Sequence, residues 1–144
     1  MGVLTMDGGQ EAQVSMNESG ATRPVVLVVE DFEDNRFMMR RLLEMSGYRV
    51  VEAINGNQAV ERAAADHPDI ILMDLSLPQL DGLAATRRIR SREGARKVPI
   101  VAVSAHDSAD FHAEALAAGC NEYVTKPIDF DQLVQLLDRL TAKS

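Results

Sequence analysis

The stretch VVLVVE, residues 25–30, decides the fold of this chain, because four similar stretches follow it. They read YRVVEA (48–53), DIILMD (69–74), VPIVAVS (98–104) and NEYVT (121–125). Runs of Val and Ile with little polar alternation are typical of parallel strands that are buried on both faces. The sequence therefore predicts five strands of one parallel sheet.

Segments with helical periodicity separate these stretches. The first helix is predicted to begin with Asp34 as its N-cap, to end at Gly47, and to turn four residues inward: Met38, Met39, Leu42 and Met45. A later helix is predicted to start at Asp107 and to stop at Gly119. The last helix has an apolar face formed by Phe130, Leu133, Val134, Leu137 and Leu140.

Five strand–helix units in succession predict a single α/β domain over residues 24–142, with a flavodoxin-like, doubly wound parallel sheet. Its strand order is expected to be 2-1-3-4-5, which places strand 1 beside strand 3. Neither a GxGxxG nor a Walker A pattern follows the first strand, which argues against a dinucleotide or nucleoside triphosphate site. Residues 1–23 have no helical or strand period, and we expect a disordered tail there.

The composition narrows the class of partner. The chain has 144 residues and a formal net charge of -7, which disfavours binding of nucleic acid or of an anionic membrane surface. Cys120 is the single cysteine, so no intrachain disulfide can form, and a lone thiol suits a reducing compartment. We expect a cytoplasmic protein whose partners are proteins or small ligands.

Polar side chains follow the predicted strands at the points where they end. Glu30 and Asp31 follow the first strand, Asp74 ends the third, and Ser104 and Lys126 end the fourth and fifth. Because the carboxyl ends of parallel strands share one edge, these groups are expected to converge. Crowded carboxylates repel unless a divalent cation neutralises them. The set predicts a Mg²⁺ site beside room for a phosphate-sized group.

Four motifs at these strand ends resemble one known family. They are VVEDFEDNR (28–36), MDLSLPQLDG (73–82), VSAHD (103–107) and YVTKPID (123–129). Together they closely resemble the receiver domain of two-component response regulators, over about residues 24 to 142. Each motif alone is weak, but all four in this order are highly specific.

The resemblance implies roles for the acidic residues. Asp74 is similar to the phosphoryl acceptor of receivers. Asp31, Asp74 and the backbone carbonyl of Ser76 are similar to direct Mg²⁺ ligands. Glu30 matches an acidic position that acts through a metal-bound water and is more often Asp.

The remaining motif residues also gain roles by resemblance. Ser104 and Lys126 are similar to the hydroxyl and the amine that hold the phosphoryl oxygens. Tyr123 matches an aromatic switch residue that responds to Ser104, and His106 matches a position that tunes dephosphorylation. In receivers the peptide bond between Lys126 and Pro127 is typically cis.

The implied function is that of a stand-alone receiver. It would take a phosphoryl group from a histidine kinase or a histidine phosphotransfer protein. It would then signal to a downstream protein through helix 4, strand 5 and helix 5, as a monomer or a phosphorylation-dependent dimer. Its only catalysis would be its own phosphorylation and autodephosphorylation. Arg36, Arg40 and Arg41 on the first helix either dock the phosphoryl donor or form a solvated face.

Two other functions are weighed against this one. A Mg²⁺-dependent phosphohydrolase of haloacid dehalogenase type also uses a strand-end Asp, but it needs a second Asp two residues later, where this chain has Ser76. A receiver-like scaffold that works without phosphorylation usually lacks an acid or the Lys. Here Glu30, Asp31, Asp74 and Lys126 are all present.

Overall fold

A computed structural model describes residues 23–77, 81–92 and 97–142 of the chain. The predicted N-terminal tail, apart from Arg23, lies outside the described residues. None of the helices in the described ranges is long and apolar enough to span a bilayer.

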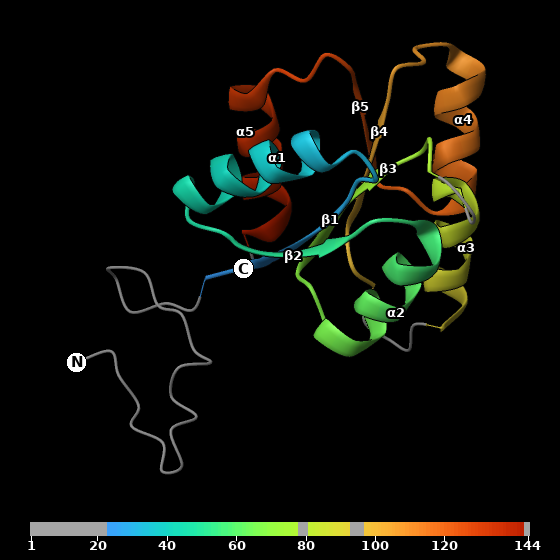
Figure 1. The fold of residues 1–144 in the computed structure, drawn as a ribbon. Helices are drawn as coiled ribbons and strands as arrows, with labels where there is room; N and C mark the ends of the chain where they lie inside the picture. The colour runs from blue at the N-terminus through green and yellow to red at the C-terminus, as the bar shows by residue number, and fades with distance from the viewer. Residues whose placement is uncertain (1–22, 78–80, 93–96, 143–144) are drawn as a thin grey trace.

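Strands and helices alternate along the whole described chain (Figure 1). The strands are β1 (Val25–Val29), β2 (Arg49–Ala53), β3 (Ile70–Asp74), β4 (Ile100–Ser104) and β5 (Glu122–Thr125). The helices are α1 (Glu33–Met45), α2 (Gly56–Asp66), α3 (Gly82–Arg92), α4 (Ala109–Ala118) and α5 (Phe130–Thr141). All strand pairs are parallel, and the order is β2-β1-β3-β4-β5. The predicted five strands and the flavodoxin-like order are confirmed.

The sheet lies between two layers of helices (Figure 1). Helices α1 and α5 cover one face, where Val26 and Val28 pack with Leu43 and Leu137. Helices α2, α3 and α4 cover the other face, where a second set of buried residues meets: Leu27, Val29, Ala59, Ala85, Ile89 and Ala115. Successive strand residues point to opposite faces, so strands covered on both sides must be apolar at nearly every position.

The start of α1 differs from the sequence prediction. Helix α1 begins at Glu33 with Phe32 as its N-cap, and Asp34 lies in the first turn without making a capping hydrogen bond. Glu33 and Asp34 still favour the helix there, because negative charge stabilises the positive end of the helix dipole. The predicted end is confirmed, since Gly47 follows the helix with a φ of 99°.

The start of α4 differs from the prediction as well, since the helix begins at Ala109 and not at Asp107. Ser108 is the N-cap, and its side chain accepts a hydrogen bond from the amide of Phe111 at 3.2 Å. The Asp107 carboxylate instead accepts a hydrogen bond from Thr125 at 3.2 Å, so it is already engaged with β5. Gly119 ends this helix as predicted, with a φ of 119°.

The inward face of α1 was predicted correctly for Met39 and wrongly for Met38 and Met45. Leu43 is fully buried and Met39 packs against the core, whereas Met38 is 52% exposed and Met45 is 77% exposed. The apolar residues of α1 spread over more than its core-facing side, so periodicity alone does not fix its rotation. In the observed rotation of α1, Arg40 points toward β2, and its Nη1 lies 2.8 Å from a carboxylate oxygen of Glu52.

A tyrosine joins the start of β2 to the end of α5. Tyr48 is 2% exposed, and its hydroxyl donates to the Asp138 carboxylate at 2.5 Å. Thr141 lies 3.5 Å from the same hydroxyl. Burial, followed by the bond to Asp138, raises the pKa of Tyr48 above its ordinary value. The hydroxyl therefore stays neutral in the folded protein when it would ionise in the unfolded chain.

We expect Tyr48→Phe to lower the free energy of unfolding by about 1 to 2 kcal/mol at pH 8, because a hydrogen bond to a charged group is lost. A raised folded pKa gives stability that is present below the unfolded pKa of about 10 and is lost as the pH rises further. The difference between wild type and variant should therefore shrink by about 1 kcal/mol at pH 11 in urea unfolding. A difference that stays constant would contradict the burial of a neutral hydroxyl.

Candidate functional site

The predicted site residues meet at the carboxyl edge of the sheet. Glu30 and Asp31 follow β1, and the neighbouring strand β3 ends at Asp74. Ser104 ends β4, and Lys126 comes directly after β5. The strand order thus brings together side chains that are up to 96 residues apart along the chain, counting from Glu30 to Lys126.

Three carboxylates form the centre of this edge. Glu30, Asp31 and Asp74 each offer an oxygen within 4.8 Å of the other two. Asp74 is 5% exposed, Glu30 is partly buried, and Asp31 is exposed to solvent. Like charges at this spacing repel, so the arrangement favours a divalent cation.

The Asp74 carboxylate is held from two sides. Its Oδ1 accepts a hydrogen bond from the amide of Ser76 at 2.8 Å, and its Oδ2 lies 3.2 Å from the ammonium of Lys126. The backbone of Lys126 is also fixed, since its amide donates to the carbonyl of Ser104 at 2.8 Å. The peptide bond between Lys126 and Pro127 is cis, as the resemblance implied.

Gly82 allows α3 to begin against the end of β3. A Cβ at this position would overlap the carbonyl oxygen of Asp74 and would lie 2.8 Å from Cα of Leu75. Only glycine permits this close approach. The first residue of α3 therefore helps to set the position of the Asp74 backbone.

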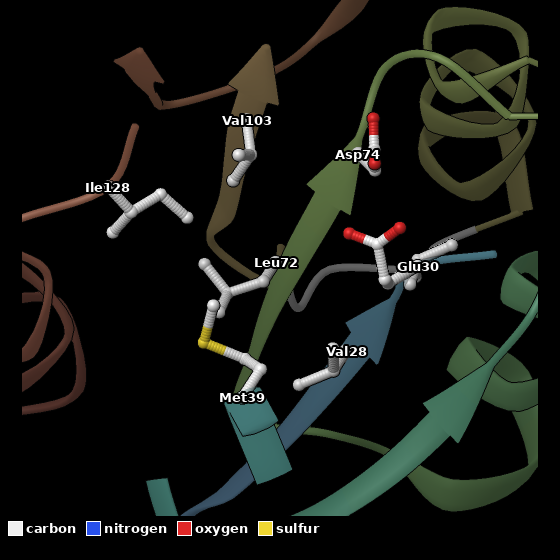
Figure 2. Close-up of a pocket in the computed structure, with 8 residues that line it drawn as sticks. Val28, Glu30, Met39, Leu72, Asp74, Val103 and Ile128 are labelled. Atoms are coloured by element: carbon white, nitrogen blue, oxygen red, sulfur yellow. The ribbon is translucent and has the colours of Figure 1, made fainter. Parts of the chain in front are cut away.

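A small cavity runs beneath the acids, between the sheet, helix α1 and the segment that precedes α5. It has a volume of about 30 Å³, enough for a water or two, and eight residues line it: Val28, Val29, Glu30, Met39, Leu72, Asp74, Val103 and Ile128. Figure 2 shows the carboxylates of Glu30 and Asp74 at one end of this cavity and apolar side chains along the rest.

The pKa of Glu30 reflects its burial and its neighbours. Desolvation by burial is the main cause that raises the pKa of Glu30, and the negative charge of Asp74 adds to it. A hydrogen bond that Glu30 accepts from the amide of Phe32, at 3.0 Å, and the charge of Lys126 act in the opposite direction. The net effect is a carboxyl that is harder to ionise than an ordinary Glu.

The donor set fits Mg²⁺ by its chemistry. Hard oxygen ligands suit this cation, which takes only one or two carboxylates and keeps several waters. Asp31 is exposed and its carboxylate accepts no hydrogen bond from the described residues. Its oxygens are therefore available, next to those of the buried Asp74.

Ser104 is linked to Tyr123 through the backbone of His106. The amide of His106 donates to Oγ of Ser104 at 3.1 Å, and the carbonyl of His106 accepts from the Tyr123 hydroxyl at 2.8 Å. The Tyr123 ring is stacked on the His112 ring, with 3.9 Å between the ring centroids. The His106 ring is stacked on the Phe111 ring, with 4.3 Å between the centroids. The loop after β4 thus connects the crevice to the surface of α4.

Two residues next to the site have contacts that the sequence did not indicate. Arg36 was expected either to dock the phosphoryl donor or to lie on a solvated face, and Glu52 was not predicted at all. Arg36 donates to the carbonyl of Glu30 at 3.0 Å and pairs with Glu52 at 3.3 Å, and Glu52 also binds Arg40. The acidic residue among the apolar residues VV and A of the stretch YRVVEA is the sequence signal that could have indicated Glu52. Of the three first-helix arginines, only Arg41 stays away from Glu52, and it lies 5.7 Å from the Phe37 ring centre.

Known proteins share both the sequence pattern and the fold. The response regulator receiver domain family matches residues 26–138. The polar-differentiation response regulator DivK of Brucella ovis is 35% identical over 112 residues, which cover 78% of this chain and 91% of that protein. The match therefore spans nearly the whole relative.

Solved structures of similar proteins have the same fold. The receiver domain of a sensor histidine kinase from Pseudomonas aeruginosa, solved with a magnesium ion in its active-site cleft, is 39% identical with a TM-score of 0.77. It matches 84% of this chain over 99% of its own length. The chemotaxis protein CheY4 of Vibrio cholerae is 26% identical with a TM-score of 0.77, over 82% of this chain and 98% of its own.

The chain belongs to the response regulator receiver domain family. It is accordingly a signalling module of two-component systems, and membership implies interaction with histidine kinases or phosphotransfer proteins.

We expect the pKa of Glu30 in the metal-free protein to lie above that of an ordinary Glu when it is measured by NMR of the side-chain carboxyl carbon. Asp74→Asn should lower this pKa, because it removes a neighbouring negative charge. Metal-free protein should lose stability as the pH rises through the raised value, since ionised Glu30 opposes folding. A pKa at or below the ordinary value would contradict the burial of this carboxyl.

Proposed function

We propose that this protein accepts a phosphoryl group on Asp74 from a phosphohistidine of a histidine kinase or a histidine phosphotransfer protein. The observation that carries this is the cluster of Glu30, Asp31 and Asp74, with oxygens within 4.8 Å, together with Lys126 at 3.2 Å from Asp74. Phosphoryl transfer needs positioning and positive charge around the transferred group more than covalent catalysis.

Each site residue has a role in this proposal. Asp31, Asp74 and the backbone carbonyl of Ser76 would hold Mg²⁺ directly, and Glu30 would act through a bound water. When bound, the cation neutralises charge on the phosphoryl oxygens. Lys126 supplies the second positive charge, and its distance of 3.2 Å from Asp74 supports this role.

The reaction is a displacement at phosphorus. An oxygen of the Asp74 carboxylate forms a bond to phosphorus, the bond from phosphorus to the imidazole nitrogen breaks, and the nitrogen keeps the electron pair. The Ser104 hydroxyl and the Lys126 ammonium hold the phosphoryl oxygens. Water later attacks phosphorus, which releases phosphate and restores the carboxylate. Exposed His106, two residues after Ser104, tunes this second step.

The phosphoryl donor docks beside α1 in this proposal. The segment between β1 and α1, with Glu30 and Asp31, is called the acidic loop below. Phe32, Phe37 and Met38 are each more than half exposed, and they lie in or beside the helix that follows this loop. Exposed apolar side chains that are close together are typical of protein-binding surfaces. Arg36 and Arg40 are paired with Glu52, so we assign no docking role to them.

The signal leaves through the loop after β4. When Ser104 turns toward a phosphoryl group on Asp74, the His106 backbone unit that bonds both Ser104 and Tyr123 has to adjust. Release of the Tyr123 hydroxyl lets the ring move inward and changes the surface of α4, β5 and α5. Such a switch is a two-state element biased by one local charge.

Incubation with acetyl phosphate and Mg²⁺ tests the acceptor. We expect the wild-type protein to gain the mass of one phosphoryl group and to lose it in alkali, because acyl phosphates are labile to base. Asp74→Asn should gain none, although it keeps the size and the hydrogen-bonding oxygen of the side chain. Intact mass spectrometry gives the readout, and equal labelling of both proteins would reject Asp74 as the acceptor.

Tyr123 variants test the switch. Tyr123→Ala should leave labelling of Asp74 nearly intact but reduce the amide NMR shifts that beryllofluoride, a stable phosphoryl mimic, causes between residues 113 and 131. Tyr123→Phe is the matched control, since it keeps the ring and removes only the bond to His106. Shifts that persist unchanged in Tyr123→Ala would assign the ring to packing alone.

A further inference from the structure

Arg36 binds the loop that carries two of the three acids. Its Nη1 lies 3.0 Å from the carbonyl oxygen of Glu30 and, in a longer contact, 3.5 Å from the carbonyl oxygen of Asp31. Its Nε lies 3.3 Å from a carboxylate oxygen of Glu52. The Arg36 side chain is only 16% exposed. A largely buried cation therefore donates to the backbone of residues whose own carboxylates face the crevice.

These two carbonyls have a particular relation to Asp31. The Glu30 carbonyl belongs to the peptide plane before the Cα of Asp31, and the Asp31 carbonyl belongs to the plane after it. Peptide units are rigid planes, so the orientation of both planes sets the direction of the Cα–Cβ bond between them. The Asp31 carboxylate accepts no hydrogen bond from any residue in the described ranges, so its direction depends on the backbone.

Glu52 fixes Arg36 in this position. It lies on β2 directly beside Val28 of β1, and its second carboxylate oxygen binds Nη1 of Arg40 at 2.8 Å. The amide of Glu30 donates to the carbonyl of the next β2 residue, Ala53, at 3.0 Å. The acidic loop is thus held by β2 on one side and by Arg36 on the other.

The choice of acceptors matters for cation binding. Arg36 donates to carbonyl oxygens and to Glu52, and not to the carboxylates of Glu30, Asp31 or Asp74. Glu52 balances its charge. Arg36 therefore orders the acidic loop without occupying the oxygens that a divalent cation would bind.

We propose that Arg36, anchored by Glu52, is a positioning residue for the divalent cation: it fixes the peptide planes on either side of Asp31. This inference rests on the proposed function, because it assigns a role toward the Mg²⁺ site of that function. Residues that orient ligands from the next layer typically change metal affinity by about 10- to 100-fold when they are removed.

The test compares Mg²⁺ affinity, measured by calorimetric titration, in wild type and Arg36→Gln. We expect the dissociation constant to rise about tenfold. Labelling by acetyl phosphate should slow at low Mg²⁺ and recover to within about twofold of wild type at saturating Mg²⁺, because Asp74 and Lys126 are untouched. A residue with only a structural role would lower the melting temperature without this dependence on Mg²⁺.

Two variants separate geometry from charge and from the ion-pair network. Arg36→Lys keeps the charge but lacks the planar fork that reaches the carbonyls and Glu52 together, so its affinity should stay low. Arg40→Gln also loses a bond to Glu52 but does not touch the acidic loop, so its affinity should equal that of wild type. Amide NMR spectra establish that each variant is folded.

Several results of these titrations would overturn the role of Arg36. Equal affinity in Arg36→Gln and wild type would overturn the inference and leave the proposed function standing. An equal loss in Arg40→Gln would overturn it as well, because the effect would then belong to the network around Glu52. If Arg36→Gln does not fold, the Mg²⁺ affinity of Glu52→Gln is measured in its place. An affinity equal to that of wild type would then reject the anchoring role of Glu52. A wild type that binds no Mg²⁺ would overturn both proposals.

Discussion

The repulsion among three carboxylates is the constraint on which the rest of the site depends. Like charges about 5 Å apart near a protein surface repel by roughly 3 kcal/mol per pair at an effective dielectric constant of about 20. Glu30, Asp31 and Asp74 lie within that distance of one another, with the Lys126 ammonium as the adjacent counter-charge. The sheet has to hold the three carboxylates together. Backbone hydrogen bonds between neighbouring strands fix the strand ends that carry them, such as those from Glu30 to Ala53 and from Lys126 to Ser104.

Helix α1 serves the site and the surface with different faces. Met39 and Leu43 face the core, Arg36 and Arg40 face Glu52 on β2, and the exposed apolar side chains face solvent. A helix that presents apolar residues beyond its core face has more apolar surface than packing requires. The docking surface that we propose and the support of the loop formed by Glu30 and Asp31 thus come from one element.

The crevice and the α4 surface are connected by a short stretch of backbone. One peptide segment at His106 bonds Ser104 on one side and Tyr123 on the other, and ring stacking extends this contact to α4 through His112. Asp107, which the sequence suggested as a helix start, instead bonds Thr125 and lies 3.2 Å from His112. The loop is therefore ordered by several weak contacts, which suits a segment that has to rearrange.

The sequence by itself determined the five strands, their order and the strand-end residues, because runs such as VVLVV and DIILM are stable only when they are buried on both faces of a parallel sheet. It did not determine the rotation of α1, since the apolar residues of that helix extend beyond its core-facing side. It also did not show the partners of Arg36, Tyr48 or Asp107. These contacts join residues on separate elements, and only the packed sheet brings Glu52 beside the acidic loop and Asp138 beside Tyr48.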